Sequence, residues 1–79
     1  MIIKILGTGC AKCNTLENKV KEVVAKNSIN AEILKVSELK DIMSYGIMMT
    51  PGLVINEKVV SFGNIPKDDQ ILNWIKGGN

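Results

Sequence analysis

The chain alternates between short apolar runs and segments whose apolar residues have helical spacing, which predicts alternating strands and helices. Ile2 to Leu6 is apolar and ends in Gly7-Thr8-Gly9, which is typical of a buried strand followed by a turn. From Cys10 to about Lys26 the apolar positions recur at i, i+4, i+7 and i+8, the spacing of one helical face. The residues on that face are Leu16, Val20, Val23 and Val24.

The middle of the chain predicts a second strand and a short helix. Ala31 to Val36 is strand-like and carries charged residues that suit the edge of a sheet. We expect Ser37 to cap a short helix that runs through Tyr45 and ends at Gly46. The side chains expected to face inward are those of Leu39, Ile42 and Met43.

The last third predicts a hairpin followed by a helix. Leu53 to Ile55 is apolar without alternation, as in a strand buried on both faces. Asn56-Glu57 is expected to turn this strand into another over residues 58–62, although the glycine that often follows asparagine in such turns is missing. A final helix is expected to start near Pro66 and to stop at Gly77-Gly78.

These elements define the fold class. Their order is β-α-β-α-β-β-α with short connections and no repeats, which predicts a single α/β domain over residues 1–79. The first β-α-β unit is expected to be a right-handed parallel crossover, and the final hairpin adds antiparallel strands. We therefore expect a four-stranded mixed sheet with helices on both faces.

Composition narrows the function classes. The chain of 79 residues has a formal net charge of +2 and contains neither histidine nor arginine. Cys₂His₂ zinc fingers and histidine-based acid–base catalysis are thereby excluded. Nucleic-acid binding is disfavoured, because guanine readout relies on arginine and base stacking on aromatic side chains. No apolar run approaches the roughly 20 residues of a membrane span, and the N-terminal segment does not fit a signal peptide. We expect a cytoplasmic monomer without nucleic-acid or membrane contacts.

The candidate chemistry lies at Cys10-Ala11-Lys12-Cys13, where the first strand passes into the first helix. Side chains three apart on a helical turn are neighbours at about 5–6 Å, close enough for a disulfide. Cys10 falls at the helix cap, where free N–H groups and the positive end of the dipole stabilise a thiolate. Cys13 lies one turn inside the helix. We therefore expect Cys10 to attack the disulfide of a protein or small-molecule partner and Cys13 to resolve the mixed disulfide.

The residues around the cysteines fit this interpretation. Gly7 and Gly9 are expected to let the backbone turn tightly and to keep Cys10 open to a bulky partner. Ala11 and Lys12 separate the two cysteines, and the lysine adds a nearby positive charge of small effect.

Two other interpretations of the cysteines remain open. Both could be small core residues, because free cysteine is often buried. The pair could also belong to a soft-metal carrier, although two thiolates cannot complete a four-coordinate zinc site in one chain. A ferredoxin-like carrier needs the order β-α-β-β-α-β and ends in a strand, which separates it from the order expected here. The redox interpretation requires no metal or other cofactor, since the cysteine pair itself carries the electrons.

Two motifs resemble those of the thioredoxin/glutaredoxin superfamily, in particular its small prokaryotic redox-active disulfide proteins. Gly7 to Cys13 matches their Gly-x-Gly-Cys-x-Lys-Cys stretch, and Met49 to Asn56 matches Met-Thr-Pro-x-Leu-Val-Ile-Asn. With the element order, the resemblance covers essentially the whole chain. Only about 5–6% of X–Pro bonds in folded proteins are cis, so composition alone predicts a trans bond before Pro51; the resemblance implies a cis bond.

The resemblance further implies a minimal thioredoxin fold and dithiol–disulfide oxidoreductase activity. It implies that the backbone of Thr50 pairs with the substrate peptide, and that Gly63 lines the same groove. The implied partners are disulfide-containing substrates and an NAD(P)H-linked flavoprotein of the thioredoxin-reductase kind. Met49 is interpreted either as part of an adaptable binding surface or as a gap-filling core residue.

Departures from the family pattern affect the finer properties. Ala11-Lys12 replaces the Gly-Pro of thioredoxins and the Pro-aromatic pair of glutaredoxins, and these residues tune the redox potential. Thioredoxins carry a buried acid on the first strand, six residues before the first cysteine, where this chain has Lys4. We interpret Lys4 as a stem packed on apolar surface with its head in water. The alternative is an ammonium near Cys13 that lowers the pKa of that thiol. Gly63-Asn64 and the acids that follow give only a faint indication of glutathione binding.

Overall fold

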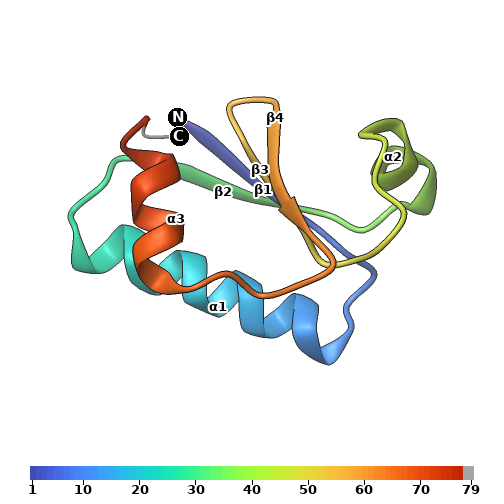
Figure 1. The fold of residues 1–79 in the computed structure, drawn as a ribbon, viewed down its shortest axis with the longest axis horizontal. Helices are drawn as coiled ribbons and strands as arrows, with labels where there is room; N and C mark the ends of the chain where they lie inside the picture. Colours follow the sequence, from blue (N-terminus) through green and yellow to red (C-terminus); the bar gives the residue numbers. More distant parts are fainter. Residues whose placement is uncertain (78–79) are drawn as a thin grey trace.

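The apolar run at the start of the chain forms the central part of a sheet. In the computed structural model, which describes residues 1–77, β1 (Ile2–Leu6) pairs in parallel with β2 (Glu32–Val36) and antiparallel with β3 (Gly52–Ile55). β3 pairs antiparallel with β4 (Lys58–Phe62), so the strand order is β2-β1-β3-β4 (Figure 1). The predicted four-stranded mixed sheet is confirmed.

Within residues 1–77, three helices pack on the two faces of this sheet. α1 (Ala11–Lys26) and α3 (Asp68–Ile75) lie on one face, whereas the short α2 (Leu39–Ser44) lies at one end of the other (Figure 1). The observed order β-α-β-α-β-β-α is the one the sequence predicts. Because β2 is followed by a helix rather than by a third strand, the ferredoxin-like arrangement of a metal carrier is excluded.

The larger core lies between the sheet and the helices α1 and α3. Successive strand residues point to opposite faces of a sheet, and β1 directs Ile3 and Ile5 towards these helices. Burying an aliphatic side chain contributes about 1.5–3 kcal/mol, so this layer holds α1, and the cysteines at its start, against the sheet. The buried members of this core are Ile3, Ile5, Leu16, Val20, Val23, Leu53, Ile55, Ile71 and Ile75.

The opposite face of the sheet carries a smaller core and one charged side chain. The buried members of this core are Leu6, Ile42, Ile47 and Val54. Lys4 points to the same face, and its ammonium donates hydrogen bonds to the hydroxyl of Tyr45 at 2.9 Å and to the carboxylate of Glu57. These bonds hold the pKa of Lys4 well above its usual range, and the bond to Glu57 has the larger effect. The lysine is therefore charged and paired on the central strand.

The short helix differs from its prediction in two respects. Ser37 does not cap it, because Glu38 occupies the N-cap position and makes no side-chain capping bond. Leu39 and Met43 are 62% and 64% exposed, whereas Ile42 is buried as expected. A helix of six residues has fewer than two turns. It meets only one end of the sheet face, so it buries one of the three side chains that the spacing placed inward.

The hairpin forms where the sequence predicts it. Asn56 and Glu57 both adopt left-handed backbone conformations, with φ of 50° and 68°. Two such residues in succession form the type I′ turn that suits the twist of a two-residue hairpin. The Asn56 side chain also accepts a hydrogen bond from the backbone N–H of Ile2 at 3.1 Å. This bond to β1 supports the asparagine in a turn that lacks the usual glycine.

The last helix begins slightly after its expected start at Pro66. Lys67 precedes the first helical residue, and its backbone N–H donates to the side-chain oxygen of Gln70 at 3.0 Å. Gly77 follows the helix with φ of 85°, as expected of a helix terminator. Gly78, assigned to the same terminus, lies outside the described residues.

Two substitutions in α2 test the corrected packing. Ile42→Ala empties a buried site and is expected to lower the free energy of unfolding by about 2–5 kcal/mol. Leu39→Ala removes an exposed side chain from the same helix, and its effect should stay within about 0.5 kcal/mol. Urea unfolding followed by circular dichroism measures both. A large loss for Leu39→Ala would instead support the inward orientation that the spacing predicted.

Candidate active site

The turn between β1 and α1 places the cysteine motif at one end of the sheet. Gly9 adopts a φ of 93°, a conformation that L side chains rarely take. Cys10 then takes extended dihedral angles as the N-cap of α1. Gly7 has no positive φ, which corrects the expectation that its conformational freedom shapes the turn. It is buried instead, against the side chain of Cys13.

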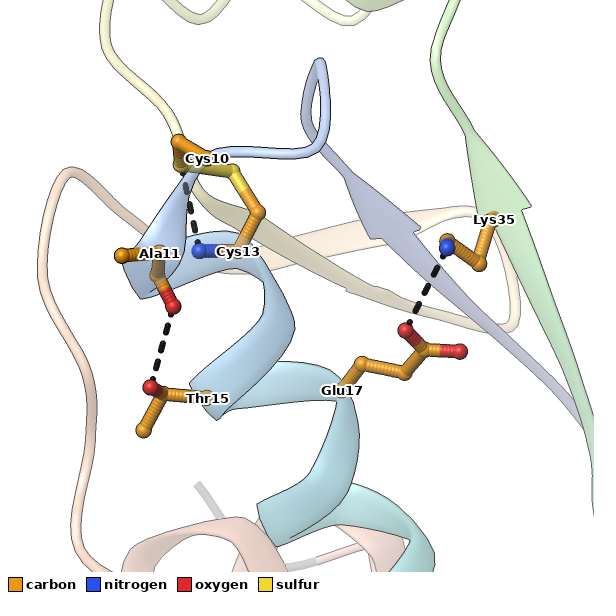
Figure 2. The surroundings of a disulfide bond; sticks show 6 residues. All are labelled: Cys10, Ala11, Cys13, Thr15, Glu17 and Lys35. Atoms are coloured by element: carbon orange, nitrogen blue, oxygen red, sulfur yellow. Dashed lines mark hydrogen bonds and ion pairs between the residues drawn. A yellow bond between two sulfur atoms is a disulfide. The ribbon is translucent and has the colours of Figure 1, made fainter.

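Cys10 and Cys13 form a disulfide, with their Cα atoms 5.0 Å apart (Figure 2). The backbone N–H of Cys13 donates a hydrogen bond to the Cys10 sulfur at 3.1 Å. A donor left free at the helix start therefore points at this sulfur, and the first turn contains no acidic residue to oppose negative charge there. Cys10 is half-buried, whereas Cys13 is only 4% exposed. The more exposed cysteine is therefore also the one whose sulfur the helix start favours as an anion.

Strand pairing brings a second loop to the same end of the sheet. Leu6 is paired with Gly52, so the residues before Gly52 approach those that follow Leu6. The Thr50–Pro51 peptide bond in this loop is cis. That is the isomer implied by the family resemblance, not the one that composition alone predicts. Thr50 is half-buried and Pro51 is buried.

The residue after β4 joins this loop. Gly52 is paired with Phe62, which brings Gly63 to the same end of the sheet. The N–H of Gly63 donates to the Pro51 carbonyl at 2.8 Å. Met49 lies over Gly63 so closely that a Cβ added there would be 3.3 Å from the Met49 Cβ. Since Met49 is 59% exposed, it belongs to the surface rather than to the core.

Lys4 lies apart from the cysteines. Its neighbours in β1, Ile3 and Ile5, face α1, so the lysine side chain is on the opposite face of the sheet. There its ammonium is bound by Tyr45 and Glu57. This arrangement supports neither a free head in water nor an effect on the Cys13 thiol.

An ion-pair cluster lies one turn beyond the cysteines on α1. The Glu17 carboxylate accepts from Lys21 at 3.0 Å and pairs with Lys35 of β2 at 3.5 Å (Figure 2 shows the second contact). The hydrogen bond from Lys21, with the charge of Lys35, lowers the pKa of Glu17. The sequence shows the i,i+4 spacing of the first pair, but the bond to β2 requires the fold. The cluster ties α1 to the edge strand.

The segment between the two cysteines lies on the surface. Ala11 and Lys12 are exposed between the cysteines. Within residues 1–77 no group of three or more cysteine, histidine or acidic side chains is placed to hold a metal ion. None of the helices in the same residues is long and apolar enough to cross a membrane.

A comparison with protein families decides the relationship of the chain. The model of a family described as the thioredoxin domain matches residues 1–76. The chain belongs to the thioredoxin family. A thioredoxin of Methanocaldococcus jannaschii is 37% identical over 76 residues, which cover 96% of this chain and 87% of that protein. A thioredoxin of Methanothermobacter thermautotrophicus is 35% identical over 71 residues, covering 90% and 92% respectively.

Family and geometry agree on the activity. The observed architecture is a minimal thioredoxin fold, and the disulfide of Cys10 and Cys13 is its redox group. The chain is a protein thiol–disulfide oxidoreductase, and the partners of this thioredoxin-family activity are disulfide-containing substrates and a reductase.

The Glu17 cluster predicts a pH dependence of stability. Because the folded chain lowers the pKa of Glu17 below its ordinary value of 4.5, the unfolded chain binds the proton first as the pH falls. The contribution of Glu17 is therefore present above that value and is lost as the pH falls towards the folded-state pKa. Glu17→Gln should be less stable than the parent chain at neutral pH, and the difference should shrink between about pH 5 and pH 3.

Urea unfolding at a series of pH values measures this difference. Glu22→Gln is the control, because it removes an exposed carboxylate of the same helix that forms no ion pair within residues 1–77. A difference for Glu17→Gln that stays constant with pH would contradict the ion-pair assignment.

Proposed function

We propose that this chain passes electrons from an NAD(P)H-linked flavoprotein reductase to protein disulfides, with Cys10 as the attacking thiol and Cys13 as the resolving thiol. The observation that carries the proposal is the hydrogen bond from the Cys13 N–H to the Cys10 sulfur at the start of α1. A hydrogen bond to an anion is stronger than one to a neutral group. The same donor therefore favours the Cys10 thiolate, which is the nucleophilic form.

The proposed cycle balances two electrons. The Cys10 thiolate attacks one sulfur of the substrate disulfide, and the other substrate sulfur leaves as a thiolate. Cys13, as a thiolate, then attacks the Cys10 sulfur of the mixed disulfide. The intramolecular disulfide forms, and the second substrate thiolate is released. The reductase returns two electrons and restores the dithiol.

The accessibility of the two sulfurs supports this order of attack. Cys10 is half-buried at a turn whose neighbours Gly9 and Ala11 are exposed, which leaves room for a partner. Cys13 is almost completely enclosed. An enclosed thiol reacts readily only with a sulfur already attached next to it, which is what the resolving step requires. Lys12, exposed between the two, adds positive charge to this surface.

The loop of Thr50 and Pro51 is the proposed docking place for the substrate peptide. It lies at the same end of the sheet as the cysteines, and an extended peptide there pairs with the backbone of Thr50. Met49, which lies over Gly63, forms an apolar border of this docking surface. The neighbouring Met48 is 95% exposed and extends that border. Flexible methionine side chains adapt to different partners.

Cellular setting and assembly follow from the same proposal. A dithiol that must be reduced in each cycle suits a reducing compartment such as the cytoplasm, and the chain is proposed to act there as a monomer.

Substitution of each cysteine separates the two roles. Cys10→Ser should abolish reduction of a protein disulfide such as insulin, because the attacking thiolate is lost. Cys13→Ser should still attack but should accumulate mixed disulfides, which non-reducing mass spectrometry detects. In the reduced parent chain, iodoacetamide should alkylate Cys10 faster than Cys13. Equal alkylation rates would remove the assignment of roles. Mixed disulfides formed by Cys10→Ser would reverse it.

The docking surface is tested with a pair of methionine substitutions. Met49→Glu places a charge beside Thr50 and should raise KM for a protein disulfide by about tenfold, a loss of about 1.4 kcal/mol. Met43→Glu makes the same change at an exposed methionine of α2 and should leave KM within about twofold. The two variants are compared in insulin reduction coupled to a dithiol regenerant. Equal effects would show that the charge, and not the place, is responsible.

A further inference from the structure

The backbone of Gly7 lies against the side chain of Cys13. It is buried at the end of β1, and a Cβ added to it would lie 2.9 Å from the Cys13 Cβ and nearer still to the Cys13 sulfur. Separations below 3.0 Å are essentially never seen for real Cβ atoms. Apart from the chain neighbours of Gly7, the described residues place no other heavy atom within 4 Å of that position. The space beside Gly7 is therefore taken by Cys13 alone.

We propose that Gly7 is a positioning residue for the resolving step: its missing side chain leaves the space from which the Cys13 sulfur closes the ring. The proposal rests on the roles assigned above to the two cysteines. It does not rest on conformational freedom, because the φ of Gly7 is not positive. Any L residue could adopt this backbone, so the requirement for glycine here comes from the cysteine side chain.

Both sides of this contact are held in place, one by a backbone hydrogen bond and the other by burial. The N–H of Gly7 donates to the Val36 carbonyl of β2 at 2.9 Å, which fixes the backbone beyond the end of β1. Cys13 is 4% exposed, and Leu16, in the next turn of α1, is completely buried in the larger core. An added methyl group would have to displace the Cys13 side chain or the first turn of α1.

The two chemical steps differ in their dependence on this contact. In the first, the Cys10 thiolate attacks the substrate disulfide, and no atom of Cys10 lies within 4 Å of a Cβ added to Gly7. In the second, the Cys13 thiolate forms a bond to the Cys10 sulfur while the bond from Cys10 to the substrate breaks, and the electron pair leaves on the substrate thiolate. Displacing a reacting atom by 1 Å can cost about 10²-fold in rate. A substitution of Gly7 should therefore slow the second step selectively.

The experiment uses Gly7→Ala, fully reduced and mixed with one equivalent of 5,5′-dithiobis(2-nitrobenzoic acid) in a stopped-flow instrument. The first nitrothiolate is released in a bimolecular reaction of Cys10, and the second in the unimolecular attack by Cys13. We expect the first rate constant to stay within about twofold of the parent value, and the second to fall at least about tenfold. A general loss of structure would affect both steps, whereas the proposal requires the second step to fall selectively, so the ratio of the two rate constants is the decisive readout.

Gly77→Ala is the control for a methyl group added away from the cysteines. Nothing lies within 4 Å of the added Cβ, and the φ of 85° makes alanine strained there, so this variant reports backbone strain at the end of α3 without contact to Cys13. Both of its rate constants should equal those of the parent chain. An unchanged second step in Gly7→Ala, or an equal fall of both steps, would overturn the proposal.

A second variant covers the case in which Gly7→Ala does not fold. Gly7→Ala/Cys13→Gly lacks both atoms that the added Cβ would meet, so it should recover the circular dichroism spectrum of the single variant Cys13→Gly. If the double variant is unfolded while Cys13→Gly is folded, Gly7 serves the backbone and the proposal is wrong. Failure of the cysteine roles is recognised separately, because Cys10→Ser would then release the first nitrothiolate as fast as the parent chain.

Discussion

The antiparallel pairing of β1 with β3 is the constraint on which the active site depends. Two segments far apart in the sequence, the cysteine turn and the Thr50–Pro51 loop, follow and precede strands that run in opposite directions. The pairing of Leu6 with Gly52 therefore brings them to one end of the sheet, and the pairing of Gly52 with Phe62 adds Gly63. The strand register therefore positions the segments that carry the site residues relative to one another.

The two faces of β1, which carries this register, are covered to different extents. On one face, Ile3 and Ile5 are enclosed by α1 and α3. On the other face, α2 covers only one end, and Lys4 lies on the strand itself. A charged group in such a place is costly unless it is paired, and Glu57 in the hairpin turn supplies the pairing. On the face that the short α2 leaves partly uncovered, the hairpin turn thus supplies the partner of the lysine.

The sequence was sufficient to predict what depends on local pattern. The order of elements, the hairpin at Asn56 and Glu57, and the position of Cys10 at a helix start all follow from periodicity and turn chemistry. It failed where the outcome depends on distances between elements. Leu39 has helical spacing with Ile42, but the sheet does not extend far enough to cover it.

Two further features could not be predicted from the sequence, because they too depend on contacts between different elements. The partners of Lys4 lie on other elements, and the contact between Gly7 and Cys13 crosses from a strand end to a helix. A glycine that is needed for space looks, in the sequence, like one that is needed for its backbone angles. The cis bond before Pro51 came only from the family resemblance.

The disulfide ring encloses just the segment from Cys10 to Cys13, of which all but the first residue already belong to α1. The entropy lost on closing a loop grows with loop length, so this ring restrains little chain compared with a bond between distant segments. The rest of the architecture is held by its cores and not by the bond. Any protein that distinguishes the reduced form of this carrier from the oxidised form must therefore recognise a single helical turn.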